Sequence, residues 1–189
     1  MKRVYLFILL LSGLAGKAQY NEEQTGIGTL RLGGGYTHDF PGLNGYTVRG
    51  EISRSLNALL DGGFAIQNSR LSGYPRTNSV KEFTHATTID FSIYLVPLRT
   101  ELQSLRFGVG YAFSFYNIRR TYPVIHEEGG VKHTSWPLAE QKGRISGLNI
   151  SGEYEYFIPL SGISIGLRAS LFKAYDQVSY FGPFVGIAL

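Results

Sequence analysis

Apolar and polar residues alternate with a period of two along most of the chain, which is the pattern of β-strands whose two faces differ in chemistry. The strongest alternation covers four ranges: 88–95, 105–116, 147–158 and 163–171. Weaker alternation covers four more: 26–37, 45–54, 60–68 and 178–189. The pattern predicts an all-β chain of about eight antiparallel strands that form one domain.

The sizes of the residues on the polar face indicate which face points outward. That face carries small residues such as Gly33, Gly108 and Gly166. Small residues suit the cramped interior of an eight-stranded barrel, whereas a soluble barrel needs a charged outer surface. We therefore expect the large apolar residues to face lipid, in an up-and-down transmembrane β-barrel. The alternative is a soluble periplasmic barrel, similar to a lipocalin, that carries an apolar ligand.

Charged residues of both signs also occur on the polar face. They are Arg31, Arg49 and Arg168, together with Glu51, Asp61, Asp90, Glu153 and Glu155. An arginine that faced lipid at mid-membrane would cost about 2 to 4 kcal/mol. We therefore expect these side chains to pair inside the barrel as structural ion pairs, which would plug the lumen and leave no open pore.

The segments between the expected strands alternate in length. One set comprises 38–44, 69–83, 119–143 and 174–177, and two of its members are long polar loops. The other set comprises 55–59, 96–104 and 159–162. Because barrels of the outer membrane have long extracellular loops and short periplasmic turns, both ends of the mature chain are expected in the periplasm.

Strand length and aromatic residues agree with a membrane span. About ten residues at a rise of ~3.4 Å, tilted near 45°, reach ~24 Å, the height of the apolar band of such barrels. The aromatic residues expected to form interfacial girdles are Tyr36, Tyr46, Phe113 and Phe115 near the long loops, and Tyr154 and Tyr156 near the short turns.

The N-terminus has the order of a secretory signal peptide. Lys2 and Arg3 precede an apolar run from Val4 to Leu14, and small residues lead to a cleavage site after Ala18. The apolar run is shorter than the ~20 residues that a spanning helix needs. We expect a signal peptide at 1–18 and a barrel domain at 19–189.

Composition and charge narrow the function classes. Charged residues make up only 17% of the chain, and the expected leader carries three positive charges, so the net charge falls from +4 to +1 on its removal. No cluster of Lys and Arg remains to follow a phosphate backbone, so nucleic-acid binding is not expected. The chain has no Cys, which excludes disulfides, Cys-based zinc sites, a catalytic thiol and lipid attachment through Cys.

With these features, residues 19–189 resemble the small bacterial outer-membrane β-barrel proteins, the class of the outer-membrane protein A transmembrane domain. The last strand carries part of the resemblance, since Val185, Ile187 and Leu189 alternate there. The resemblance implies a location in the outer membrane, contact with its lipid, and recognition by the barrel-assembly machinery during insertion. Two residues depart from the class: Leu189 replaces a terminal aromatic, and Pro183 removes a ladder hydrogen bond, which we expect to mark a bulge or a shifted register.

The range 119–143 holds the candidate metal ligands. His126, Glu127, Glu128 and His133 lie close in sequence and could bind zinc or a similar metal. Their spacing fits no helical or finger motif, so a solvated loop without a metal is expected.

The same range holds the candidate catalytic residues. Some small outer-membrane barrels are enzymes that act on lipid A, and His126, Ser135 and Glu140 could serve as base, nucleophile and orienter. Their order and spacing match no such motif, and His38 and His85 are expected to be rim residues. The sequence therefore predicts a non-enzymatic barrel without cofactor, whose loops 69–83 and 119–143 bind an unidentified extracellular ligand or partner; a lipid-A-modifying enzyme is the alternative.

Overall fold

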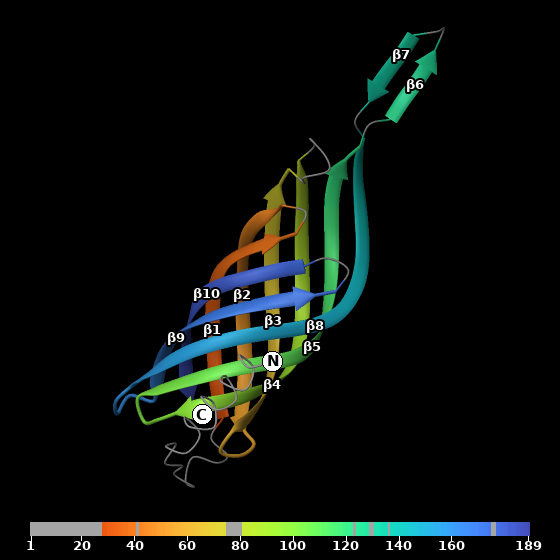
Figure 1. The fold of residues 1–189 in the computed structure, drawn as a ribbon. Coiled ribbons are helices and arrows are strands. Elements are labelled where there is room, and N and C mark those ends of the chain that lie inside the picture. Colours follow the sequence, from red (N-terminus) through yellow and green to blue (C-terminus); the bar gives the residue numbers. More distant parts are fainter. Residues whose placement is uncertain are drawn as a thin grey trace, which may run out of the picture.

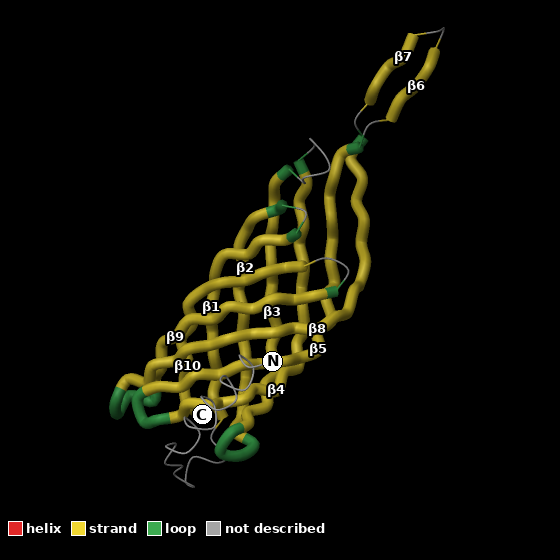
Figure 2. Tube along the Cα trace, viewed as in Figure 1, coloured by secondary structure: helices red, strands yellow, loops and turns green. Residues whose placement is uncertain are grey.

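Eight strands form one closed antiparallel barrel, in the order β1-β10-β9-β8-β5-β4-β3-β2 (Figures 1 and 2). The computed structural model describes residues 28–40, 42–74, 81–122, 124–128, 131–135, 137–174 and 177–189, so the expected signal peptide lies outside the described residues. The barrel strands are β1 (Gly28–Asp39), β2 (Asn44–Ser55), β3 (Leu60–Gly73), β4 (Glu82–Arg99), β5 (Gln103–Thr121), β8 (Leu138–Ile158), β9 (Ile163–Lys173) and β10 (Gln177–Ala188). Among the described residues, no helix is long and apolar enough to cross a membrane.

Each barrel strand coincides with one of the eight expected ranges, so the prediction of an eight-stranded up-and-down barrel is confirmed. We call the end that holds the connections 56–59, 100–102 and 159–162 the turn end, and the opposite end the loop end. The barrel begins and finishes at the turn end, where the backbone amide of Leu189 donates to the carbonyl oxygen of Gly28 at 2.8 Å.

The longest expected loop, 119–143, is largely strand, and that prediction is wrong. β5 continues to Thr121 and β8 begins at Leu138, which makes them 19 and 21 residues long. Between them, β6 (Val124–Glu128) and β7 (Val131–Ser135) form a separate two-stranded hairpin that extends beyond the barrel (Figure 1). Outside a membrane neither face of a strand has to be apolar, so this extension lacks the alternation that marks the other strands.

The connection expected at 96–104 is also shorter than predicted. β4 runs on to Arg99, and its pairing with β5 shifts register between Leu95 and Leu98, which marks a β-bulge. At the bulge, Val96 is 1% exposed and its backbone amide donates to the carbonyl oxygen of Leu59 at 2.8 Å. The bulge turns an apolar residue inward against the β2–β3 turn.

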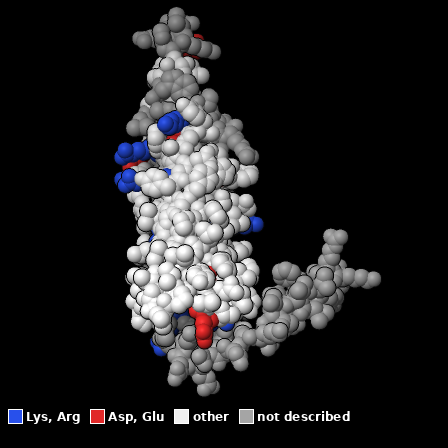
Figure 3. Space-filling model, turned by 90° about the vertical axis from the view of Figure 1, so that its left-hand side faces the viewer, with Lys and Arg blue, Asp and Glu red and all other residues white. Residues whose placement is uncertain are grey.

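The packing is inverted relative to a soluble protein. Large apolar side chains such as Val48, Ile93 and Val109 stand exposed on the outer surface, while Arg, Glu, Asp, Ser and Thr are buried inside. Figure 3 shows a wide, almost uncharged band on the outer surface, with charged residues gathered near its two ends. Burying charge while exposing aliphatic side chains is stable only where the outer face meets lipid, so the structure supports the lipid-facing assignment over the soluble barrel.

The six aromatic residues expected in the girdles all point outward. Their exposed fractions lie between 41% and 57%. The hydroxyl group of Tyr154 donates to the side-chain oxygen of Gln103 at 2.8 Å, as expected of an aromatic residue whose tip meets the polar side of an interface.

Pro183 causes neither a bulge nor a register shift. Its neighbours keep one constant register with β1, although the β1–β10 ladder omits the two pairs between Gly33↔Phe184 and Tyr36↔Phe181. The two backbones approach closely at this gap, because a Cβ atom on Gly35 would lie 2.2 Å from the carbonyl oxygen of Phe181. Glycine therefore lets the barrel close where proline cannot donate a hydrogen bond.

Candidate functional site

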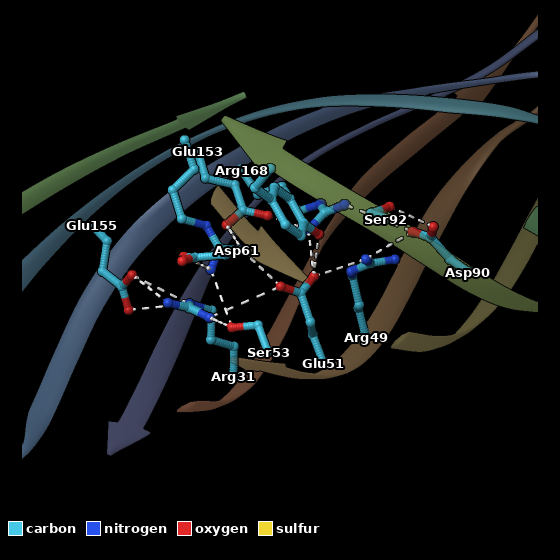
Figure 4. A network of polar contacts seen from close by, with 12 residues as sticks. Arg31, Arg49, Glu51, Ser53, Asp61, Asp90, Ser92, Glu153, Glu155 and Arg168 are labelled. Atoms are coloured by element: carbon cyan, nitrogen blue, oxygen red, sulfur yellow. Dashed lines mark hydrogen bonds and ion pairs between the residues drawn. The ribbon is translucent and has the colours of Figure 1, made fainter. Parts of the chain in front are cut away.

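The middle of the lumen is filled by ten charged side chains that we call the lumenal cluster. It consists of Arg31, Arg49, Arg99, Arg106 and Arg168, with Glu51, Asp61, Asp90, Glu153 and Glu155. All eight residues expected to pair inside the barrel belong to it, so that prediction is confirmed. In Figure 4 the labelled side chains of this cluster, among them Arg31, Glu51 and Arg168, point towards one another from different strands.

Glu51 of β2 is the centre of the cluster. Its carboxylate lies 2.7 Å from a guanidinium nitrogen of Arg106 and 2.7 Å from one of Arg168. Arg49 approaches the same carboxylate to 2.9 Å, and the hydroxyl group of Tyr94 donates to it at 2.7 Å. One carboxylate thus joins strands that are not neighbours in the barrel.

Arg106 of β5 crosses the lumen to meet three carboxylates. It lies 2.7 Å from both Glu51 and Glu153 and 3.6 Å from Asp61, and its side chain is 1% exposed. Its guanidinium carbon lies 4.0 Å from the centre of the Tyr94 ring, a cation–π contact. The burial of this arginine is therefore matched by negative charge on several sides.

The remaining acids extend the cluster towards both ends. At the turn end, Arg31 binds Glu155 at 2.7 Å, and the hydroxyl group of Ser164 donates to the same carboxylate at 2.5 Å. Towards the loop end, Arg49 lies 2.9 Å from Asp90. The cluster therefore ties the first strands of the barrel to the last ones, across the lumen.

The charges of the cluster balance, with five arginines facing five carboxylates. The sequence interpretation included three of the arginines and missed Arg99 and Arg106. Arg106 could have been found, since it alternates with Leu105 and Phe107 in the strongest strand of the chain. The excess of carboxylates in the expected set was itself a signal, because unpaired buried charge is costly.

The cluster separates two cavities of the lumen. A cavity of about 400 Å³ lies on the loop-end side and one of about 260 Å³ on the turn-end side, whereas the space within the cluster, beside Glu51 and Arg168, is about 10 Å³. The expected plugging of the interior by ion pairs matches this arrangement.

Towards the loop end, the outer faces of β3, β5 and β8 carry a cluster of exposed cations. We call Arg70, Arg119, Lys142 and Arg144 the basic cluster. Arg70, His85, Asn117 and Lys142 lie opposite one another on successive strands. Arg70, Phe83, His85, Asn117 and Arg119 line a shared groove of about 600 Å³.

Glu140 lies among these cations. The side-chain amide of Asn117 donates to its carboxylate at 2.6 Å, and Arg119 and Lys142 lie 3.6 and 3.5 Å away. The hydrogen bond from Asn117, followed by the two positive charges, lowers the pKa of Glu140 below its ordinary value.

The candidate catalytic residues do not converge. His126 lies on β6, opposite His133 in the hairpin register, while the hydroxyl group of Ser135 donates to the carbonyl oxygen of Val124 at 3.5 Å. Glu140, on β8, is occupied by Asn117 and two cations. These contacts do not form the chain from nucleophile to base to orienter that a catalytic triad requires.

The other histidines lie at the rim, as expected. A ring nitrogen of His38 lies 2.8 Å from the side-chain oxygen of Asn44, and a ring nitrogen of His85 lies 3.1 Å from the side-chain oxygen of Asn68.

The candidate metal ligands lie in the hairpin, where the register places Glu127 opposite Lys132 and Glu128 opposite Val131. Among the described residues, no group of three or more His, Asp and Glu side chains could hold a metal ion.

Comparison with known proteins gives a likeness of fold. The sequence matches no protein-family model and no curated protein. Two crystal structures of Ail, the attachment invasion locus protein of Yersinia pestis, have TM-scores of 0.56 and 0.53 with this chain. Each alignment has 9% sequence identity and covers 87% of this chain and 99% of Ail. The second structure is a complex with the heparin analogue sucrose octasulfate. The N-terminal β-barrel domain of Pseudomonas aeruginosa OprF has a TM-score of 0.43 at 11% identity, over 87% of this chain and 98% of that domain. The chain has the fold of the small eight-stranded outer-membrane β-barrels.

Proposed function

We propose that this chain is a non-enzymatic protein of a bacterial outer membrane that binds an extended segment of a partner protein outside the cell. The apolar outer band supports the membrane location, and the long strands at the loop end support the external orientation. Val185, Ile187 and Leu189, which are exposed on the outer side of the last strand, support recognition by the barrel-assembly machinery.

One observation carries the binding proposal, and it is the free edge of β8. Residues 138–147 pair with β5 on one side. On the other side the first paired residue is Leu148, opposite Lys173, and no described strand pairs with 138–147. This edge therefore presents unpaired backbone amides and carbonyls, to which an extended peptide can add as a further strand.

The side chains along the edge define the kind of partner. Glu140, Lys142 and Arg144 stand exposed on one face of this part of β8, while Ala139 and Ile145 are half-buried on the other. A strand added here would meet charge on one face and the uncharged side chains of Ala139, Gln141 and Ile145 on the other. The partner segment would therefore alternate charged and uncharged residues.

Location is tested first, by electrophoresis of the membrane-extracted protein with and without boiling. An outer-membrane protein of this fold should be recovered in the outer-membrane fraction and should migrate faster until it is heated. Recovery in the soluble fraction without a mobility shift would contradict the location. A His126→Ala variant should leave the mass profile of lipid A unchanged, and a changed profile would restore the enzyme hypothesis.

Edge binding is tested with random twelve-residue peptides on phage, selected on the protein in lipid nanodiscs. Selected peptides should slow hydrogen exchange of the amides of 139–146. The backbone N–H groups of an edge strand point alternately towards its paired strand and towards the free edge. Of the variants Gln141→Pro and Lys142→Pro, one should therefore remove an N–H at the free edge only, keep the β5–β8 ladder and lose peptide binding. The matched variants Gln141→Ala and Lys142→Ala should bind normally; protection elsewhere, or equal loss in the alanine variants, would refute the proposal.

The basic cluster supports a second candidate, the binding of a sulfated polysaccharide. Its cations are exposed, and Ail, which shares the fold, has been solved with a heparin analogue. Sucrose octasulfate should then bind the nanodisc-embedded protein with an affinity that falls as salt rises. Replacing Arg119 and Lys142 by Gln should weaken binding, whereas Arg54→Gln, at the turn end, should not; an equal effect of both changes would exclude this site.

A further inference from the structure

The cavity at the loop end of the lumen differs in chemistry from the rest of the barrel interior. We call it the outer vestibule, and it has a volume of about 400 Å³. Apolar side chains from five strands line its walls: Leu71, Ile118, Ile145, Phe172 and Val178. The cavity at the turn end differs in that several charged side chains, Arg31, Asp61, Arg99 and Glu155 among them, line it beside apolar ones such as Phe157 and Ile163.

A patch of hydrogen-bonding groups forms the floor of the outer vestibule. The hydroxyl group of Thr88 donates to that of Ser114 at 2.9 Å, and Gln67 accepts a hydrogen bond from Arg49 of the lumenal cluster at 3.2 Å. Ser69 lies 2.6 Å from Thr47, oxygen to oxygen. The floor is therefore polar and fixed by the cluster beneath it, while the walls above it are apolar.

Asp39 is the one charged residue among the described residues that line the vestibule. Its carboxylate accepts hydrogen bonds from the backbone amides of Gly42, at 3.0 Å, and Leu43, at 2.7 Å, so it stabilises the β1–β2 turn. The described part of the lining thus offers no cation to an anionic ligand, and its carboxylate is used by the protein itself.

Apolar walls are unfavourable in a vestibule that holds only water. Apolar walls with a few placed polar groups, in a volume of 300 to 1,000 Å³, are typical of pockets for small molecules. We propose that the outer vestibule binds a small uncharged amphiphile. Its apolar body would pack against Ile118, Ile145 and Phe172, and its polar end would bond to the Thr88–Ser114 pair. This proposal is independent of the β8 edge.

The walls provide their own probes, because β8 carries isoleucines on both sides. Ile145 lines the vestibule, whereas Ile150 is exposed on the lipid-facing surface. Methyl NMR of the protein in lipid nanodiscs therefore distinguishes a molecule in the lumen from one dissolved in lipid. The probe is 1-decanol, compared with decanoate and decyltrimethylammonium, which have the same chain and opposite charges.

Decanol should shift the methyl resonances of Ile118 and Ile145 in a saturable way, and the two charged analogues should shift them at least tenfold less at the same concentration. Ala86→Phe, which fills the vestibule, should abolish the shifts, while Ala86→Ser should retain them; heat-dependent mobility shows whether each variant is folded. Shifts confined to Ile150, or equal shifts with all three probes, would overturn the proposal, and the probe comparison needs no variant.

Discussion

Arg106 shows how a single side chain can be buried in this barrel without a large cost. A lone guanidinium group in a dry lumen would lose its hydration without compensation, but three carboxylates and an aromatic ring surround this one. Buried ion pairs contribute little net stability compared with an apolar filling, yet removing one partner leaves an uncompensated charge. The lumenal cluster is therefore sensitive to any change that breaks its neutrality.

Glu51→Gln tests this sensitivity at the centre of the cluster. The amide keeps the shape of the side chain but removes the charge that Arg49, Arg106 and Arg168 share. We expect the free energy of unfolding to fall by about 3 to 5 kcal/mol. This free energy is measured by urea titration in phospholipid vesicles, with the heat-dependent electrophoretic mobility as the readout of the folded fraction. Glu101→Gln, which alters an exposed carboxylate at the turn end, should have almost no effect. Equal urea midpoints for the two variants would contradict the place of Glu51 at the centre of the cluster.

Glu140 gives a prediction on pH. Because its pKa is lowered, the carboxylate should stay ionised below the ordinary range of glutamate, and its contacts should be lost only as pH falls through that lowered pKa. Carbon-13 NMR of labelled glutamate in nanodiscs follows the titration. Asn117→Ala should raise the pKa more than Lys142→Ala, since the hydrogen bond from Asn117 is the largest cause. The reverse order would show that the cations dominate.

At the scale of elements, the seam between β1 and β10 is the place where the barrel closes. Closure here cannot depend on an uninterrupted ladder, because Pro183 has no N–H and two pairs of the ladder are absent. The strands instead come into backbone contact over Gly35 and Gly182, where a Cβ on Gly182 would lie 2.4 Å from the carbonyl oxygen of Gly34.

Two neighbouring glycines test the close approach at the seam. A Cβ on Gly35 would meet backbone at 2.2 Å, whereas the nearest atom to a Cβ on Gly34 lies at 3.5 Å. Gly35→Ala should therefore push β1 away from β10 and lower the temperature at which the folded mobility is lost. Gly34→Ala, one residue away, should leave it within a few degrees. Similar behaviour of the two variants would show that the seam tolerates a side chain.

The same elements show what the sequence could and could not predict. In the membrane, lipid on one face and a narrow lumen on the other impose an alternation that located all eight strands. Beyond the membrane, Asn117, Arg119 and Glu140 meet water on the outer face, so the strand extension has no apolar signature. The sign of the charges on the polar face predicted pairing, but which arginine meets which carboxylate depends on register and on contacts across the lumen.

At the scale of the whole molecule, the barrel and its extension are held by different forces. The barrel is fixed by lipid outside, ion pairs inside and a closed ladder. Among the described strands, those of the β6–β7 hairpin pair only with each other, and both are five residues long. A two-stranded hairpin of this size contributes little stability to a protein, which makes it a surface feature and not a structural support.

Replacing residues 123–137 by Asn-Gly-Thr tests this division of the molecule. The backbone amide of Tyr122 donates to the carbonyl oxygen of residue 137 at 3.4 Å, so a two-residue Asn-Gly turn can join these positions once Thr replaces Pro137 and supplies the N–H that closes the turn. The shortened protein should keep its urea midpoint, because β6 and β7 pair with none of the described strands of the barrel. Peptides selected for the β8 edge should still bind, since residues 138–147 remain in place. A lower midpoint would make the hairpin part of the fold, whereas loss of peptide binding at an unchanged midpoint would move the binding surface from the edge of β8 to the hairpin itself.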